Sequence, residues 1–153
     1  MLTQVTLDDT HAIAIGAGIL GTGGGGNTYI GRIRLERALK EFEKPVTIIT
    51  ADDVADDALV CAVSMMGAPT VSVEKLATGE EILNGIRALE NHLQQKVEAI
   101  IIGEIGGANA LGPLIAGLQC DLPVIDGDGM GRAFPELQMD TFNIGGITPD
   151  PFV

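Results

Sequence analysis

Apolar residues in this chain follow two patterns, one typical of buried strands and the other typical of amphipathic helices. Short continuous apolar runs predict strands at residues 46–49, 59–63, 97–102 and 122–125, with a last one at 141–144. Apolar positions at helical spacing predict four helices. The first ends near residue 20, the second covers residues 29–42, the third ends near residue 95, and the fourth covers residues 108–118. Strands that alternate with helices predict an α/β domain with three layers and a mainly parallel, Rossmann-like sheet.

Two of the predicted helices begin at pairs of residues typical of capping boxes. Thr6 precedes Asp9, and Thr78 precedes Glu81 at the same spacing. In such a pair the hydroxyl and the carboxylate accept hydrogen bonds from backbone N–H groups of the first turn. We therefore expect the first helix to begin after Thr6 and the third to begin after Thr78.

Residues 100–136 contain the most informative part of the pattern. The apolar runs at 100–102 and 122–125 flank the helix at 108–118, and each run is followed by a glycine-rich turn with acidic residues. In a strand–helix–strand unit both strands are parallel, so the two turns lie at the same carboxyl edge of the sheet. Ligands of open α/β sheets bind in crevices at that edge. We therefore expect the functional site there.

The composition limits the classes of partner and the location. The 153 residues suit one domain with a proper core, and they carry a formal net charge of −12. This charge argues against nucleic acid and against an anionic membrane surface as partners. No apolar run approaches the roughly 20 residues of a membrane span, and no signal peptide is evident, so we expect a cytoplasmic protein. Cys61 and Cys120 are expected to be small buried hydrophobes in a reducing compartment.

A run of glycines follows the first predicted helix. Gly21, Gly23 and Gly26 match the spacing of a dinucleotide-binding loop, and the first and last of them match that of a P-loop. Asn27 stands where a P-loop has lysine, and a helix rather than a strand precedes the run. Two interpretations stay open: backbone N–H groups that cradle an anion or a substrate, or a hinge or tight corner. Under the first interpretation the binding residues are Gly23, Gly24, Gly25, Gly26 and Asn27.

Four acidic residues follow the two strands of this unit, and they are Glu104, Asp126, Asp128 and Glu136. We take them as candidate catalytic residues, since carboxylates that meet in a crevice can act as general acid and base on a bound water. Asp126 and Asp128 are also candidate ligands of a divalent metal ion. An EF-hand is excluded because Met130 occupies its fifth position. The alternative for the acids is helix capping or turn formation.

Neighbouring residues complete the candidate site. Arg132 is placed to neutralise the carboxylates or to hold a substrate carboxylate, and Asn109 offers an amide to a polar substrate. Gly106 and Gly107 allow the backbone to approach a ligand closely. The turn at residues 64–69, which follows another predicted strand, is a further candidate wall of the site.

Three segments of the chain carry a family resemblance: GTGGGGN at residues 21–27, GEIGGANAL at 103–111 and LPVIDGDGMGRAFPELQM at 122–139. Together they resemble the family that includes S-methyl-thiohydantoin desulfurase, often encoded beside hydantoinase and oxoprolinase enzymes. The resemblance covers nearly the whole chain. It implies action on a small five-membered cyclic ureide or thio-ureide, by hydrolytic loss of the sulfur substituent at C2.

The resemblance also implies a second, largely β domain. We therefore expect residues 1–146 to form the α/β domain and residues 147–153 to begin a linker to a C-terminal domain. As a mechanistic hypothesis, a water molecule attacks the ring C2 carbon. A metal ion between Asp126 and Asp128 is the candidate group that holds this water. One of the two candidate glutamates moves the proton, whereas Arg132 and the Asn109 amide orient the ring.

Two other functions stay open at this point. The domain could bind a nucleotide or a phosphorylated metabolite through the loop at residues 21–26 and perform no hydrolysis. It could instead be a non-catalytic subunit of a hydantoinase- or oxoprolinase-type complex. The expected partners are thus a small-molecule substrate and the C-terminal domain, with a homo-oligomer or a hydantoinase-type partner as further candidates.

Overall fold

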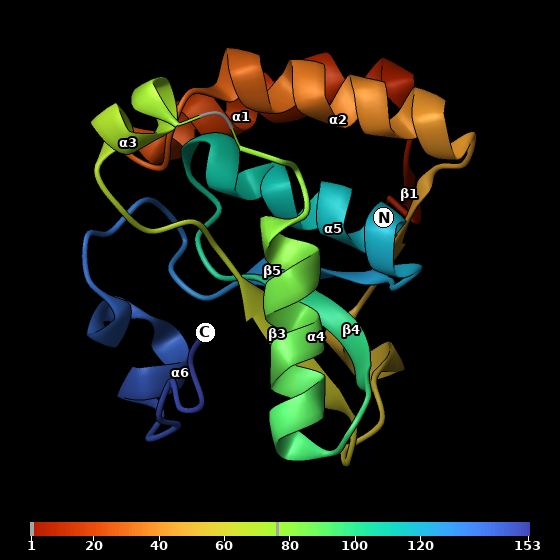
Figure 1. Ribbon diagram of the computed structural model, residues 1–153, viewed down its shortest axis with the longest axis vertical. Helices are drawn as coiled ribbons and strands as arrows, with labels where there is room; N and C mark the ends of the chain where they lie inside the picture. The colour runs from red at the N-terminus through yellow and green to blue at the C-terminus, as the bar shows by residue number, and fades with distance from the viewer. Residues whose placement is uncertain (1, 76) are drawn as a thin grey trace.

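The computed structural model describes residues 2–75 and 77–153. Its strands are β1 (Gln4–Val5), β2 (Val46–Ile49), β3 (Leu59–Val63), β4 (Val97–Ile102) and β5 (Val124–Asp128). Its helices are α1 (Thr10–Gly21), α2 (Thr28–Phe42), α3 (Pro69–Glu74), α4 (Glu81–Leu93), α5 (Gly112–Cys120) and α6 (Thr141–Ile144). Strands and helices alternate along much of the chain (Figure 1), and the predicted α/β class is confirmed.

The five strands form one sheet in the order β1-β2-β5-β4-β3. β2, β5, β4 and β3 are parallel, whereas β1 pairs antiparallel with β2 at one edge. In the β4–α5–β5 unit, Ile100 lies opposite Val124 in the parallel ladder. The register shifts after Ile101, and Gly129 N then donates to Ile102 O at 3.0 Å. β4 and β5 therefore end side by side at the carboxyl edge of the sheet.

The helices form two layers over the sheet. α5 packs on β2, β4 and β5, and α4 packs beside α5. α1 and α2 pack against each other, and both contact the short 3-10 helix Gly107–Ala110 that precedes α5. In Figure 1 these two helices, coloured red to orange, lie side by side above α5. The sheet, α5 with α4, and the α1–α2 pair are thus the three layers of the domain.

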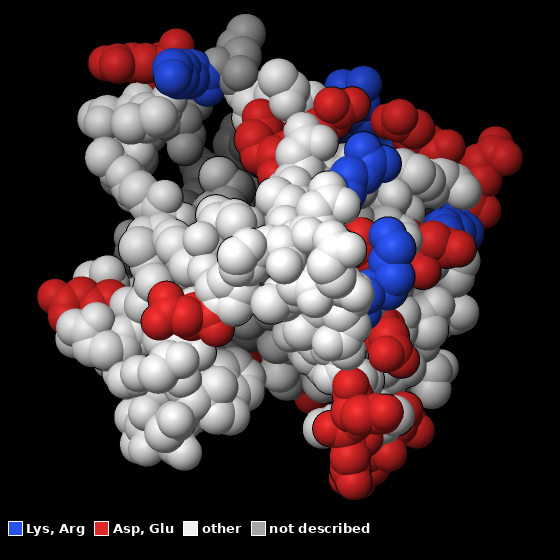
Figure 2. Space-filling view, turned by 60° about the horizontal axis from the view of Figure 1, so that its bottom comes forward, with Lys and Arg blue, Asp and Glu red and all other residues white. Residues whose placement is uncertain are grey.

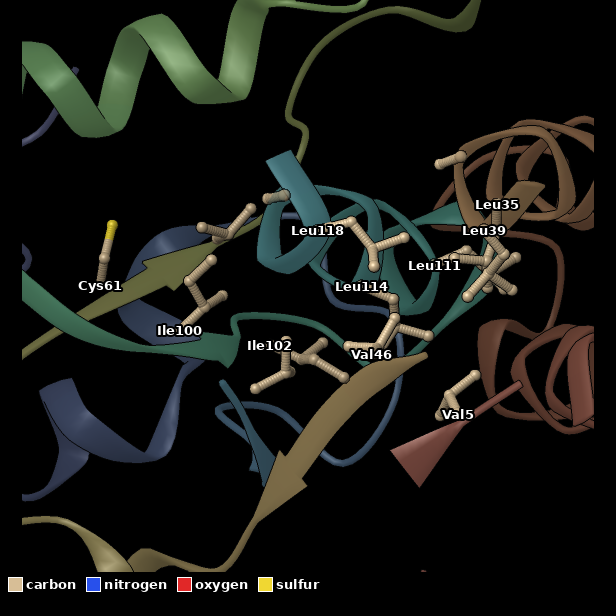
Figure 3. Close-up of a cluster of buried hydrophobic side chains, with 14 of the residues drawn as sticks. Val5, Leu35, Leu39, Val46, Cys61, Ile100, Ile102, Leu111, Leu114 and Leu118 are labelled. Atoms are coloured by element: carbon tan, nitrogen blue, oxygen red, sulfur yellow. The ribbon is translucent and has the colours of Figure 1, made fainter. Parts of the chain in front are cut away.

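The hydrophobic core lies where α5 meets the sheet and the α1–α2 pair (Figure 3). Leu35 of α2, Ile100 of β4 and Leu111 are each 0% exposed. Leu111 is also the first of three leucines at helical spacing, followed by Leu114 and Leu118, and all three are buried. Full burial of one such side chain stabilises a fold by about 1.5–3 kcal/mol.

Polar side chains determine where the helices begin. Thr6 N donates to Asp9 Oδ2 at 2.8 Å, and this predicted capping box is confirmed, although it begins the 3-10 helix Leu7–Asp9 and α1 itself begins at Thr10. Thr78 N donates to Glu81 Oε1 at 2.7 Å, but the predicted capping box is wrong, because the N-cap of α4 is Glu80 and no side chain caps this helix. Asn27 caps α2, because its Oδ1 accepts hydrogen bonds at 2.9 and 3.2 Å from two N–H groups of the first turn.

The prediction of a strand at residues 141–144 is wrong, because this segment forms helix α6. Asp140 Oδ1 accepts a hydrogen bond from Asn143 N at 2.6 Å, and this N-cap favours a helical turn. Thr141 N also donates to Gly129 O at 2.7 Å, which anchors the turn beside the end of β5. A segment this short has no period that distinguishes a strand from a helix.

Two further boundaries differ from the prediction. The helix predicted at residues 108–118 is divided into the 3-10 helix and α5, which continues to Cys120. The strand predicted from residue 122 begins at Val124, because Asp121 is left-handed (φ 58) and Leu122 N is still bonded to the end of α5. β5 then continues to Asp128, so Asp126 and Asp128 belong to the strand itself rather than to a turn after it.

The remaining parts of the chain add little regular structure. β1 and α3 were not predicted, since each is too short to show a period. Residues 147–153 contain no helix or strand. The end of this segment lies beside α4, because a methyl group added at Gly85 would lie 3.6 Å from Val153 Cγ2. Among the described helices, none combines the length and the apolar character needed to cross a membrane.

Candidate functional site

Three glycine-containing segments meet at the carboxyl edge of the sheet. A methyl group at Gly25 would lie 2.0 Å from Gly106 O, and one at Gly24 would lie 2.9 Å from Ala133 Cβ. A methyl group at Gly106 would in turn lie 2.8 Å from Ala133 N. Residues 21–26, 103–109 and 131–134 are therefore in direct contact, and we name this contact the glycine junction. Its segments lie within the three sequence motifs at residues 21–27, 103–111 and 122–139.

Hydrogen bonds join the three segments of the glycine junction. Asn109 N donates to Gly25 O at 3.1 Å, and Ala108 N donates to Gly26 O at 3.3 Å. Arg132 Nη2 donates to Thr22 Oγ1 at 2.8 Å. The loop at residues 21–26 thus directs the carbonyl groups of Gly25 and Gly26 toward the rest of the protein. A loop that cradles a phosphate instead presents backbone N–H groups to it.

Most glycines of the loop have a packing reason to be glycine. Gly25 and Gly26 have φ values of +74° and +88°, and added methyl groups would meet the 103–108 segment at both positions. Gly23 differs, since its φ is +97° but a methyl group there would meet nothing within 4 Å. The tight-corner interpretation therefore accounts for the close-packed glycines, and Gly23 remains the one whose surroundings are open.

Glu104 and Asn109 form a buried polar pair inside the junction. Glu104 is 8% exposed and Asn109 is 5% exposed. Asn109 Nδ2 donates a hydrogen bond to Glu104 Oε1 at 3.1 Å. Asn109 Nδ2 also donates to Met65 O at 3.0 Å, and Asn109 Oδ1 accepts from Met65 N at 2.9 Å. The amide therefore holds the chain that leaves β3 against the turn that leaves β4.

Within the described part of the chain, Glu104 has no ion-pair partner and no second hydrogen-bond donor. A methyl group at Gly25 would lie 2.6 Å from Glu104 Oε1, so the carboxylate faces the glycine loop. Neither Glu104 oxygen is among the buried side-chain atoms of the described residues that have no hydrogen-bond partner, so the unbonded oxygen keeps access to solvent. Among the four predicted acids, Glu104 is the one whose residue is buried.

The two aspartates of β5 have different surroundings. Asp128 is half-buried, and its Oδ1 accepts hydrogen bonds from Met130 N at 2.8 Å and from Gly131 N. These bonds form the turn that leads into residues 131–134, which is the turn-forming alternative for this aspartate. Asp126 is exposed, with no side-chain hydrogen bond to any described residue.

Arg132 and Glu136 lie on the surface. The Arg132 guanidinium is 5.4 Å from the centre of the Phe134 ring and bonds to Thr22. Glu136 is exposed, and its carboxylate accepts a hydrogen bond from the Gln138 amide. Arg132 therefore lies at the rim of the junction, whereas the contacts of Glu136 are local.

No group of three or more His, Cys, Asp and Glu side chains that could hold a metal ion occurs within residues 2–75 and 77–153. Asp126 and Asp128 remain the two predicted ligands, and one oxygen of Asp128 is already bonded to backbone N–H groups. Metal use stays a prediction.

Two surface hollows lie away from the predicted site residues. One, of about 340 Å³, lies between α1 and α2 and is lined by residues that include Ile15, Ile19 and Tyr29. His11 and Arg32 also line it, and their side chains are joined at 2.7 Å between Nδ1 and Nη1. No sequence motif marked this groove.

The second hollow, of about 280 Å³, lies beside the start of β2 and the end of α5. Lys44 and Asp121 line it, and the hydrogen bond from Lys44 lowers the pKa of the Asp121 carboxyl.

On the face shown in Figure 2, acidic side chains lie mostly toward the edges and uncharged residues occupy the centre. This face therefore presents no broad basic patch.

Comparison with known proteins places this architecture in a family. The chain matches the family described as S-Me-THD-like, N-terminal domain, over residues 8–153. A crystal structure of a protein from Chromobacterium violaceum, determined by the Northeast Structural Genomics Consortium, is similar at 26% identity and a TM-score of 0.74. The similarity covers 98% of this chain and 41% of that chain, so this chain spans about two fifths of its length. No curated protein matches. The chain belongs to the S-Me-THD-like family, as its N-terminal domain.

Proposed function

We propose that this chain is the N-terminal domain of a hydrolase that acts on a small cyclic hydantoin- or thiohydantoin-type substrate, in the manner of S-methyl-thiohydantoin desulfurase. The observation that carries the proposal is the buried Glu104–Asn109 pair, at the place where all three family motifs meet. A carboxylate that a polar side chain holds in place is suited to act as a general acid or base.

The proposed reaction replaces the C2 sulfur substituent of the ring by oxygen. A water oxygen bonds to C2, the C2–S bond breaks, and methanethiol leaves with a proton that came from the water. C2 becomes a carbonyl carbon, its double bond to the ring nitrogen becomes a single bond, and that nitrogen takes the second proton of the water, so the product is a hydantoin. The protein has to accept a proton from the water and return one to the departing sulfur.

Glu104 is the better of the two candidate glutamates for this proton transfer. It lies in the glycine junction, whereas Glu136 is exposed and bonded to Gln138. Arg132 at the rim suits a carboxylate side chain on the ring. Asp126 and Asp128 provide two carboxylates without a third ligand from the described residues, so they do not fit a complete metal site, and we route no step through a metal.

We further propose that a C-terminal domain completes the site. The Chromobacterium violaceum protein is more than twice the length of the region that this chain matches, which leaves room for such a domain. On this proposal residues 147–153 begin the linker, and the glycine junction faces the second domain. Substrate binding by the isolated chain would then be weaker than binding by the full-length protein.

The test is an activity and binding assay on the full-length protein. It measures methanethiol release from an S-methyl-thiohydantoin with a thiol-reactive dye, and thermal shifts with hydantoins and with nucleotides. Glu104→Gln should reduce kcat by at least about a hundredfold, since general acid–base catalysis contributes about 10²–10⁴. The control is Glu98→Gln, which changes an exposed carboxylate at the other end of β4. Near wild-type release by Glu104→Gln, or a thermal shift with nucleotides alone, would overturn the proposal.

A further inference from the structure

We infer that the outer face of α1 and α2 is the interface between two copies of this protein, related by a two-fold axis. Four large apolar side chains form this face, and they are Ile15 and Ile19 of α1 and Tyr29 and Ile33 of α2. Within each helix the two residues are four positions apart, so they lie on the same side of it. We name these four residues the α1–α2 face. The inference does not depend on the proposed function, because it concerns the association of copies rather than the chemistry of the glycine junction.

The four side chains of the α1–α2 face are exposed although they are large and apolar. Ile19 is 70% exposed, and Tyr29, Ile15 and Ile33 are 60%, 52% and 43% exposed. Single exposed apolar residues are common on protein surfaces, whereas a group of them on one face marks an interaction site. The two helices form the layer of the domain that is farthest from the sheet (Figure 1). The core of the domain therefore does not cover this face.

α1 is apolar on its exposed side as well as on its buried side. Its sequence, Thr10–Gly21, contains no Asp, Glu, Lys or Arg. Ala14 and Ala17 are buried within the domain, whereas Ile15 and Ile19 are exposed. A helix at the surface of a globular protein normally has a polar outer side, and a helix that is apolar all round is normally buried. α1 therefore has the composition of a helix that is covered on both sides.

The distribution of charge favours a second copy as the cover. The chain carries 21 acidic and 9 basic residues, which give a net charge of −12. Residues 10–42 carry four basic and two acidic residues, a net charge of +2, so the rest of the chain carries −14. A two-fold interface brings the same patch of both copies together, and like charges that face each other oppose association. The uncharged α1–α2 face can therefore meet itself, whereas the acidic surfaces repel their own copies.

The shape of this face also suits a second copy, because a two-fold contact requires a projection and a hollow on the same patch. The hollow, of about 340 Å³, lies between the two helices and is lined by residues that include Ala14 and Gly18. A methyl group at Gly18 would reach within 3.8 Å of Thr28 Oγ1 on the other helix, and it would narrow this space. Ile19, the most exposed of the four side chains, projects beside the hollow. An apolar side chain of one copy thus packs between the helices of the other, as a knob packs into a hole.

The experiment measures the molar mass of the full-length protein by sedimentation equilibrium over a range of concentrations. The wild-type protein should form a dimer. Ile19→Asp should weaken dimerisation about a hundredfold or more, because the two-fold axis brings both introduced carboxylates into one apolar interface. Tyr29→Asp should weaken it as well, and an aspartate in the first turn of α2 favours the helix, so this variant keeps its fold. The control is Ile144→Asp, which changes a 76% exposed isoleucine of α6 and should leave the dimer intact.

Each outcome decides the inference. A wild-type protein that stays monomeric at every concentration overturns it, and the cover of α1 is then another part of the polypeptide or another molecule. A dimer that persists in both Ile19→Asp and Tyr29→Asp overturns it as well, because its interface then lies elsewhere. Equal dissociation of the Ile144→Asp control has the same consequence. The release of methanethiol plays no part in this measurement, so a failure of the proposed function leaves the inference standing.

Discussion

Replacement of Gly25 by alanine tests the close packing of the glycine junction directly. The added methyl group would lie 2.0 Å from Gly106 O, 2.5 Å from Gly106 C and 2.6 Å from Glu104 Oε1. The first two of these atoms belong to backbone, which cannot move aside as the end of a flexible side chain can. The residue also has a φ of +74°, which L-residues rarely adopt.

The expected loss of stability follows from these two effects. The left-handed backbone costs a non-glycine residue about 1–2 kcal/mol, and forcing a methyl group into a packed site costs about 1–3 kcal/mol. Gly25→Ala should therefore lower the free energy of unfolding by about 2–5 kcal/mol. Gly23→Ala is a matched control, since its φ is +97° but its methyl group meets nothing within 4 Å. It should cost only the backbone term of about 1–2 kcal/mol.

The assay is urea unfolding of both variants, followed by circular dichroism, with thermal unfolding as a second measurement. For a chain of this size 1 kcal/mol corresponds to about 2–4 °C in Tm. Gly25→Ala should therefore unfold at a clearly lower temperature than Gly23→Ala. Equal destabilisation by the two substitutions would refute the packing argument, because both share the backbone cost and differ in steric contact alone.

Three further predictions concern other parts of the fold. Gly16→Ala in α1 should raise the free energy of unfolding by about 0.5–1 kcal/mol, because the added methyl group meets nothing within 4 Å and alanine favours the helix. An unchanged or lower urea midpoint would contradict this prediction. The hydrogen bond from the Thr6 hydroxyl lowers the pKa of Asp9 in the folded state, so its contribution to stability is present at neutral pH. This contribution should fade as the pH falls below about 4, and the acid-induced loss of stability should be smaller in Asp9→Asn. Burial raises the pKa of the Cys61 thiol and of the Cys120 thiol. A thiol reagent at pH 8 should therefore label both residues more slowly in folded than in urea-unfolded protein, and Cys61, the more buried of the two, should react more slowly than Cys120. Fast labelling of Cys61 in the folded state would contradict its burial.

Much of the fold could be predicted because buried parallel strands leave a strong signal in the sequence. The runs at residues 46–49, 59–63 and 97–102 have the bounds of β2, β3 and β4. Each is a continuous apolar run between polar turns, which is typical of a strand covered by helices. The segment at residues 141–144 lacks this length, and its helical turn depends on the Asp140 cap and on the contact with Gly129.

The sequence motifs could be assigned to segments of the chain, but the contacts between them could not be predicted, and the location of the site stays a prediction. Glycines in the loop at residues 21–26 are compatible with ligand binding and with close packing, and the sequence does not contain the contacts that distinguish the two. The same limit applies to Asn109, whose amide is polar in any interpretation. Its partners, Met65 and Glu104, become visible only when β3 and β4 are placed side by side. Whether the junction binds a ring stays a prediction.

Glu104→Gln should separate the stability of the fold from its proposed activity. Glutamine has nearly the same volume, and its oxygen can still accept the hydrogen bond from Asn109 Nδ2. The substitution also breaks no ion pair within the described residues. We therefore expect Glu104→Gln to leave the free energy of unfolding unchanged or to raise it by up to about 2 kcal/mol, whereas substrate turnover falls.

Urea unfolding of the full-length Glu104→Gln variant, compared with wild type and with Glu98→Gln, measures this separation. Sites that bind a ligand commonly retain groups that destabilise the free protein, because the ligand supplies the missing partner. A purely structural carboxylate would give the opposite result, since its replacement would lower stability and turnover together. A loss of more than about 1 kcal/mol in Glu104→Gln would therefore assign Glu104 to the packing of the junction rather than to its chemistry.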